Sequence, residues 1–186
     1  MKFSFATLAL VALLGTAGVQ SASAQKAKTV MVGGAPMYPT KNIVENAVNS
    51  KDHTTLVAAV KAAGLVETLS GPGPFTVFAP TNEAFNALPP GTVETLVKPE
   101  NKATLTKILT YHVVAGKMTS ADLAKAIKAG GGTAKLTTVQ GETLTAMMKG
   151  KNIEVKDEKG GVATVTIADV IQSNGVIHVV NKVLMP

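Results

Sequence analysis

The sequence predicts an α+β domain whose helices lie mostly in the N-terminal half and whose strands lie mostly in the C-terminal half. Between Ile43 and Ala129, apolar residues recur mainly at helical spacing, and from Ala134 onward they alternate with a period of two. Glycine-containing turn signals separate the alternating segments, which is typical of antiparallel hairpins. Because the helices precede the strands instead of alternating with them, the pattern favours α+β over repeated βαβ units.

The first 24 residues have the pattern of a secretory signal peptide. Met1-Lys2 supplies a basic start, an apolar stretch extends to Val19, and Ala22-Ser23-Ala24 supplies small residues at the cut. We expect cleavage after Ala24 and a secreted or periplasmic protein. The apolar stretch is interrupted by glycines and is shorter than the roughly 20 residues of a spanning helix, so no transmembrane segment is expected after signal removal.

Residues 25–39 contain Gly33-Gly34, Pro36 and Pro39 and show no sustained period, which predicts a flexible leader. The folded domain is expected to span residues 40–186.

Helices are expected in six segments around one buried strand. The helical segments are residues 43–48, 56–63, 84–88, 93–97, 99–109 and 119–129. Phe75 to Ala79 is rich in β-forming residues and predicts the strand, after which Thr81 can cap the next helix. Thr119 and Asp122 have the spacing of a capping box. Tyr111-His112-Val113-Val114 is expected to be extended.

Strands are expected in the C-terminal part of the chain. The segments are residues 134–138, 143–148, 153–156, 162–171, 176–180 and 183–185. Asn174-Gly175 predicts a type I′ turn, because both central residues of that turn need a positive φ.

The composition excludes several classes of protein. The 186 residues include no Cys, which excludes disulfide scaffolds, Cys-ligated zinc and thiol nucleophiles. All 18 basic residues are Lys and oppose 12 acidic residues, for a net charge of +6. Because Arg provides the usual bidentate contacts to phosphate and guanine, its absence argues against a nucleic-acid partner.

The remaining residues do not predict an enzyme, a cofactor or a metal site. His53, His112 and His178 are far apart in the sequence, and no G-x-S-x-G elbow or phosphate-binding glycine loop is present. We expect His112 and His178 to be hydrogen-bonded core histidines and His53 to be solvated near a helix start. Asp157-Glu158 lies beside a Lys-Gly-Gly turn and is expected to form a solvated hairpin end.

Three segments resemble signature regions of the fasciclin domain family. Phe75 to Phe85 (FTVFAPTNEAF) resembles the first box, Tyr111-His112 is similar to the central Tyr-His pair, and Asn174 to Pro186 (NGVIHVVNKVLMP) resembles the second box. The resemblance implies a β-wedge of two sheets packed with several helices. It also implies a bacterial, single-domain, secreted module for adhesion or interaction, with a cell-surface or extracellular protein or polysaccharide as partner.

The same resemblance implies a contact site for such a partner. Asp169-Val170 occupies the position of an Asp-Ile pair that is tied to integrin-mediated adhesion in animal fasciclin domains, together with residues around Tyr111-His112. The alternative is that Asp169 closes a turn and that Tyr111 fills the core.

A second functional hypothesis is binding of a small apolar ligand, such as a carotenoid or a lipid. Some fasciclin-domain proteins of photosynthetic organisms bind carotenoids, and here Met118, Met147 and Met148 could line an apolar surface. The sequence indicates neither an individual partner nor an oligomeric state.

Overall fold

The computed structural model describes residues 28–186, so the expected signal peptide and its cleavage site after Ala24 lie outside the described residues. In this range the α-helices are α1 (Ile43–Ala47), α2 (Thr54–Ala63), α3 (Val66–Ser70), α4 (Asn82–Asn86), α5 (Thr92–Leu96), α6 (Lys102–Tyr111) and α7 (Ser120–Ala129), with 3-10 helices at Lys51–His53 and Pro99–Asn101. The strands are β1 (Val30–Val32), β2 (Ala35–Met37), β3 (Phe75–Pro80), β4 (Val113–Ala115), β5 (Thr133–Thr137), β6 (Thr143–Lys149), β7 (Asn152–Lys156), β8 (Val162–Gln172) and β9 (Gly175–Val180). No helix of these residues is long and apolar enough to cross a membrane.

Strands β3 to β9 form one sheet in the order β4-β3-β9-β8-β7-β6-β5, and β1 and β2 form a separate hairpin. β3 and β9 are parallel, whereas the other neighbouring pairs are antiparallel. The two edges of the sheet approach each other, because Val139 N donates to Val113 O at 2.8 Å and Val114 bridges Thr138. The sheet therefore curls into a wedge. The α+β fold class, with most helices in the N-terminal half, is confirmed.

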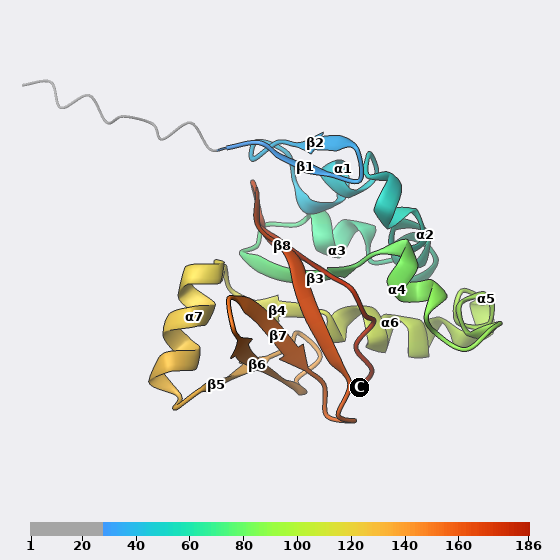
Figure 1. Cartoon of the computed structure of the whole chain (residues 1–186). Coiled ribbons are helices and arrows are strands. Elements are labelled where there is room, and N and C mark those ends of the chain that lie inside the picture. Colours follow the sequence, from blue (N-terminus) through green and yellow to red (C-terminus); the bar gives the residue numbers. More distant parts are fainter. Residues whose placement is uncertain (1–27) are drawn as a thin grey trace, which may run out of the picture.

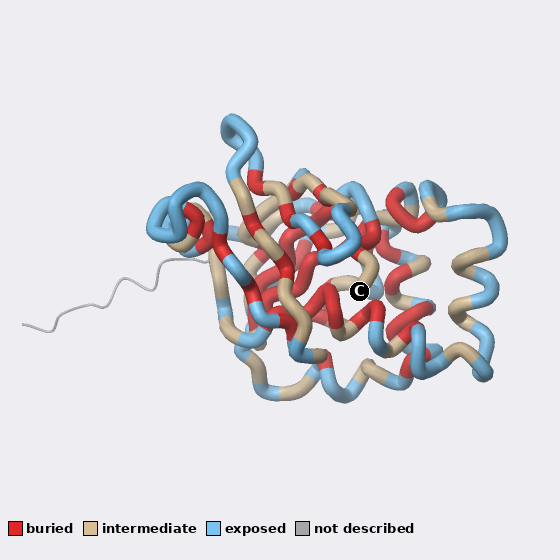
Figure 2. Tube along the Cα trace, turned by 90° about the horizontal axis from the view of Figure 1, so that it is seen from below, coloured by how far each residue is buried: buried red, intermediate tan, exposed pale blue. Residues whose placement is uncertain are grey.

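Two apolar cores lie on opposite faces of this sheet. The first is between the sheet and the N-terminal helices, where Val77 and Ile177 pack with Ile108 and other buried residues. The second lies inside the wedge, where Phe78, Leu144 and Leu123 of α7 meet. Figure 1 shows α7 beside β5, β6 and β7, on the opposite side of the molecule from α2, α4 and α5. Buried residues gather along the middle of the molecule, and exposed residues lie in the projecting loops (Figure 2).

Strand β8 links the two parts of the sheet through irregular pairing. Its register with β9 shifts between Val165 and Ile167 and again between Ile167 and Val170. Val165 faces the core inside the wedge, whereas Ile167 and Val170 pack in the helical core. Such bulges change the direction in which side chains point without ending a strand. In β8 the change moves the apolar side chains from the core inside the wedge to the helical core.

Several local signals in the sequence form as expected. Thr81 accepts a hydrogen bond from Ala84 N and caps α4, and Thr119 and Asp122 form the capping box of α7. Gly64 ends α2 in the left-handed region with φ 73°, which glycine adopts without the steric cost of a Cβ.

The expectation of a leader without regular structure is wrong for residues 30–37, which form the β1–β2 hairpin. Val32 and Met37 are 1% and 2% exposed and pack in the helical core. Tyr38, directly after β2, exchanges two hydrogen bonds with the Asn46 side chain, Tyr38 N to Oδ1 at 3.0 Å and Nδ2 to Tyr38 O at 2.8 Å. Side-chain burial and this amide hold the segment, and neither leaves a periodic signal in so short a stretch.

The C-terminal signature segment also differs from expectation. Residues 183–185 form no strand, although Val183 and Leu184 are buried. Asn174 and Gly175 do not form a type I′ turn, because among described residues Asp169 is the one non-glycine position with positive φ and Gly175 has none. Gly175 instead starts β9, where a Cβ would collide with the Phe75 carbonyl oxygen of the parallel strand β3. The glycine is required by this close approach of two strands.

Candidate functional site

Tyr111 and His112 lie at the C-terminal end of α6 and not in an extended segment, which corrects the sequence-based expectation. Tyr111 is the last helical residue and His112 follows it with helical dihedral angles. Leu109 packs in the core beside the N-terminal helices and Tyr111 packs in the core inside the wedge, so the last turn of α6 contacts both cores. Both members of the pair are buried, at 0% and 2% exposure, so neither side chain meets solvent in this structure.

The Tyr111 hydroxyl ties the helix to the strands. It accepts a hydrogen bond from Glu158 N at 3.1 Å and donates to Thr143 O at 3.3 Å. Burial raises the pKa of the Tyr111 hydroxyl above its usual 10.0. The group is therefore a neutral structural hydrogen-bonding residue at neutral pH.

His112 is held in one neutral tautomer by two backbone groups. Its Nε2 accepts from Leu184 N at 2.9 Å, so its Nδ1 carries the proton and donates to Ile108 O at 2.8 Å. Burial lowers the pKa of His112 to about 4. This imidazole fixes the C-terminal segment against α6, as expected of a hydrogen-bonded core histidine.

Asp169 and Val170 lie at the second irregularity of β8. Val170 is fully buried, whereas Asp169 is partly exposed and has φ 58°, the left-handed region that is costly for residues other than glycine. The Asp169 carboxylate accepts from Ser120 N at 2.6 Å and from the Ser120 hydroxyl. Because Ser120 is the first residue of α7, the carboxylate satisfies an amide at the positive end of that helix.

His178 supports the same corner from β9. Its Nδ1 accepts from Asp169 N at 3.4 Å, and its Nε2 donates to Met118 O at 2.8 Å. Burial lowers the pKa of His178 below 6.5, which favours the neutral form that these two contacts need. His178 is thus also a hydrogen-bonded core histidine, as the sequence predicts.

The structure does not bring the four predicted contact residues together on one surface. Tyr111 bonds to β6 and to the turn after β7, whereas Asp169 bonds to the start of α7. Three of the four side chains are buried, and the fourth is committed to Ser120. Their surroundings support the alternative in which both pairs hold the fold.

His53 is buried, at 1% exposure, which corrects the expectation that it is solvated. It ends the 3-10 helix before α2, and its Nδ1 lies 2.9 Å from the Ser50 hydroxyl oxygen. Burial lowers the pKa of His53 below 6.5. The ring borders an apolar cavity of about 40 Å³ between α1, α2, α3, β3 and β9.

Asp157 also differs from expectation, because it is buried and not part of a solvated hairpin end. Its carboxylate accepts from Gly161 N at 2.6 Å and from Met185 N at 3.1 Å. The side chain closes the turn and anchors the C-terminus. Within residues 28–186, no group of three or more His, Cys, Asp or Glu side chains is arranged to hold a metal ion.

Sequence reasoning missed the structural role of Asn174. Its Nδ2 donates to Leu69 O at 2.8 Å and to Gly71 O at 2.9 Å, and its Oδ1 accepts from Ile43 N at 3.1 Å. One side chain therefore joins the β8–β9 connection to α1 and α3. The Asn-Gly pair is the sequence signal at this position, but it predicts a local turn and gives no indication of the long-range contacts.

Comparisons with known proteins identify the family to which this fold and sequence are similar. The family model described as "Fasciclin domain" matches residues 51–186. "Protein sll1483" of Synechocystis sp. is 50% identical over 159 residues, covering 86% of this chain and 81% of the relative. "Immunogenic protein MPB70" of Mycobacterium bovis is 35% identical over 179 residues, covering 94% and 82%.

Two further matches come from animals. "Transforming growth factor-beta-induced protein ig-h3" of Sus scrofa is 40% identical over 131 residues, covering 70% of this chain and 17% of that protein. The solved structure of a FAS1 domain pair from the insect cell adhesion molecule Fasciclin I has a TM-score of 0.71 at 18% identity. It aligns with 78% of this chain and 51% of its own, and it shows the shared fold.

Proposed function

The chain belongs to the fasciclin domain family, and from this premise we propose that it is an exported, non-enzymatic interaction module that mediates cell-surface or matrix adhesion through protein or glycan contacts. The family is known for adhesion and extracellular interaction. The observation that carries the proposal is the fasciclin-domain match over residues 51–186, which includes all three signature segments. The signal-peptide pattern of the first 24 residues supports export.

The state of the histidines supports a non-enzymatic role. General acid–base catalysis needs a titratable group that can reach a substrate and that changes protonation near the working pH. All three imidazoles are buried, and burial lowers each pKa below 6.5. Each ring of His112 and His178 also has both nitrogens engaged by backbone groups.

The alternative of a carotenoid or lipid ligand receives no support. The apolar cavity beside His53 measures about 40 Å³, whereas pockets for small molecules measure about 300–1,000 Å³. Met118, Met147 and Met148 do not border it. Met118 instead packs against the core inside the wedge.

Adhesion can be tested with the protein purified from its native host and labelled with a fluorophore. We expect saturable retention on the envelope fraction of that host, competed by unlabelled protein. A lysine-rich protein of matched size and net charge serves as the control for nonspecific attraction. Retention equal to that of this control, or no competition, would contradict the proposed function.

A further inference from the structure

Among residues 28–186, no helix covers the outer surface of strands β5, β6 and β7 and of residues 162–166 of β8. We refer to this surface as the bare face. Residues at alternate positions of these strands, such as Leu144 and Val155, point into the wedge core. The residues between them point outward, and none of those is buried. α7 packs on the inner side through Leu123 and Ile127, so it does not cover the bare face.

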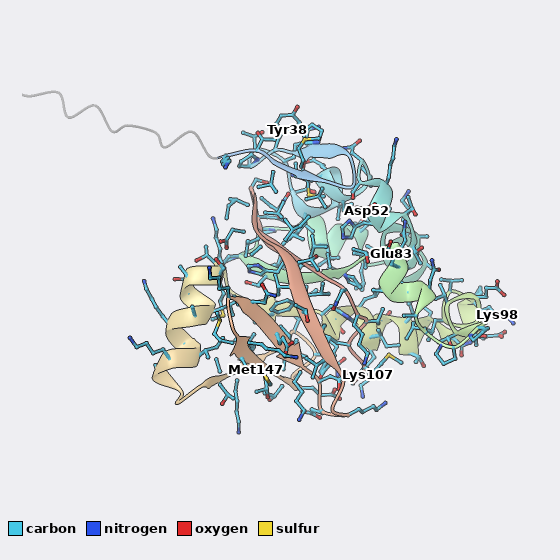
Figure 3. The ribbon with its side chains drawn as sticks, in the orientation of Figure 1. Tyr38, Asp52, Glu83, Lys98, Lys107 and Met147 are labelled. Atoms are coloured by element: carbon cyan, nitrogen blue, oxygen red, sulfur yellow. The ribbon has the colours of Figure 1, made fainter. Side chains whose placement is uncertain are left out.

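Threonine dominates this surface. The outward-pointing threonines are Thr133, Thr137, Thr143, Thr145, Thr164 and Thr166. Each hydroxyl can both donate and accept a hydrogen bond, as can each hydroxyl of a sugar. Apolar contacts between them come from Met147, whose position on the strands is labelled in Figure 3, and from Val162.

Two lysines lie in one row across the bare face. Lys135 is directly opposite Thr145, and Thr145 is directly opposite Lys156. Since neighbouring strands are about 4.8 Å apart, the two lysine backbones are about 10 Å apart. A threonine hydroxyl between two ammonium groups suits a ligand that carries both hydroxyls and repeated negative charges.

The nearby carboxylates leave these lysines uncompensated. Glu142 pairs with Lys107 at 2.9 Å and Glu154 pairs with Lys149 at 3.3 Å. Asp157 is turned inward to backbone amides, and Glu158 accepts from Thr143 N at 3.3 Å. In the part of the chain that the structure describes, Lys135 and Lys156 have no carboxylate partner. The face therefore attracts anions.

The side chains that are absent from the bare face identify the class of partner. Protein interfaces concentrate their binding energy in Trp, Tyr and Arg, and single-stranded nucleic acids stack on aromatic rings. The outward positions of these strands carry no aromatic residue, and the whole chain has no Arg and no Trp. We propose that the bare face binds an acidic polysaccharide, whose carboxylates and hydroxyls contact the lysines and threonines of the face. This inference rests on the proposed function as an adhesion module and names its partner class.

The probe is polygalacturonate, a uronate polymer, with three comparison ligands: neutral dextran, polyglutamate and phosphatidylglycerol vesicles. We expect the full secreted protein to bind polygalacturonate, to bind dextran and polyglutamate more weakly, and to lose affinity with added salt because exposed charges are screened. Equal binding of polyglutamate would show attraction to charge alone and overturn the proposal. Binding of the vesicles but not of polygalacturonate would assign the face to a lipid surface and also overturn it.

Variants locate the binding. The double substitution K135Q/K156Q should weaken polygalacturonate binding about fivefold, as expected for the loss of two exposed ion pairs. Thr145→Val, which keeps the shape and removes the hydroxyl, should weaken it about twofold. The matched control is K98Q/K102Q, which removes the same charge from exposed lysines, and Lys98 lies beside α5, far from Met147 (Figure 3). Equal losses in the two double variants would overturn the proposal.

The same variants separate this inference from the proposed function. If wild-type protein and K135Q/K156Q are retained equally on the envelope fraction, the proposed adhesion function stands and the proposed binding role of the bare face is wrong. If wild-type protein is not retained on the envelope, the proposed function fails, whatever the result with polygalacturonate. Circular dichroism and the thermal midpoint of each double variant should match wild type, because within residues 28–186 the substituted lysines form no ion pair with a carboxylate.

Discussion

The two parts of the single seven-stranded sheet differ in the residues on their outer faces and in what covers them. Over β3 and β9 the outer face carries Val77, Ala79, Ile177 and Val179, and the N-terminal helices bury it. Over β5, β6 and β7 the outer face carries threonines and lysines, and none of the helices that the structure describes covers it. β8 belongs to both parts and changes from one to the other at its bulges. The covered region holds the fold, whereas the bare face is the region for which we propose a binding role.

The largest expected effect contrasts one residue from each region. Ile177→Ala removes a buried side chain from the covered face and should lower the free energy of unfolding by about 2–5 kcal/mol. Thr145→Ala on the bare face should change it by less than about 1 kcal/mol. Urea unfolding of the two variants measures both. Similar losses would show that the bare face also contributes to the core and would contradict the proposed difference between the two regions.

A second expected effect is loss of stability at mildly acid pH. Because the pKa of His112 is about 4 in the folded protein and 6.5 in the unfolded chain, its contribution is present above pH 6.5 and declines below it. From pH 7.5 to pH 5 this residue alone should lower the free energy of unfolding by about 2 kcal/mol. His53 and His178 act in the same direction.

Urea unfolding at pH 7.5, 6 and 5 measures this decline. A decline of the same size in a folded His112→Gln variant would show that the imidazole is not its source. All three histidines are buried and none lies in β5, β6 or β7, so binding by the bare face should not change between pH 7.5 and 6.

The third expected effect concerns the bulge that joins the two regions. Asp169→Ala keeps a side chain at φ 58° and loses the contacts to Ser120, so it should destabilise the protein by about 1–2 kcal/mol. Asp169→Gly loses the same contacts but relieves the left-handed strain, so it should cost less. Thermal unfolding of both variants checks the order. If Asp169→Ala instead removes envelope retention without a change in stability, the carboxylate contacts a partner, as the family resemblance implies.

The sequence predicts those features whose cause is local. Alternation from Ala134 onward predicts β5 to β8, because each strand has one face in the wedge core. Thr119 and Asp122 predict the start of α7, because a capping box acts within four residues.

Features with distant causes escape such patterns. Asn174 has the local signature of a turn, but its side chain forms hydrogen bonds to α1 and α3. Leu184 is apolar because its side chain is buried, although the segment that contains it forms no strand. His53 is polar in sequence and buried in space. The candidate site is the feature that the sequence predicts least well. Three of its four predicted residues are buried in the core, and the bare face contains none of the signature segments of the family.

The most direct test of the bare face is a map of where polygalacturonate contacts the protein, measured by backbone amide chemical shifts in solution NMR. We expect shift changes concentrated in residues 133–166, strongest at Lys135, Thr145 and Lys156, and absent from α2, α4 and α5. Changes concentrated in the N-terminal helices, with none in β5, β6 and β7, would contradict it.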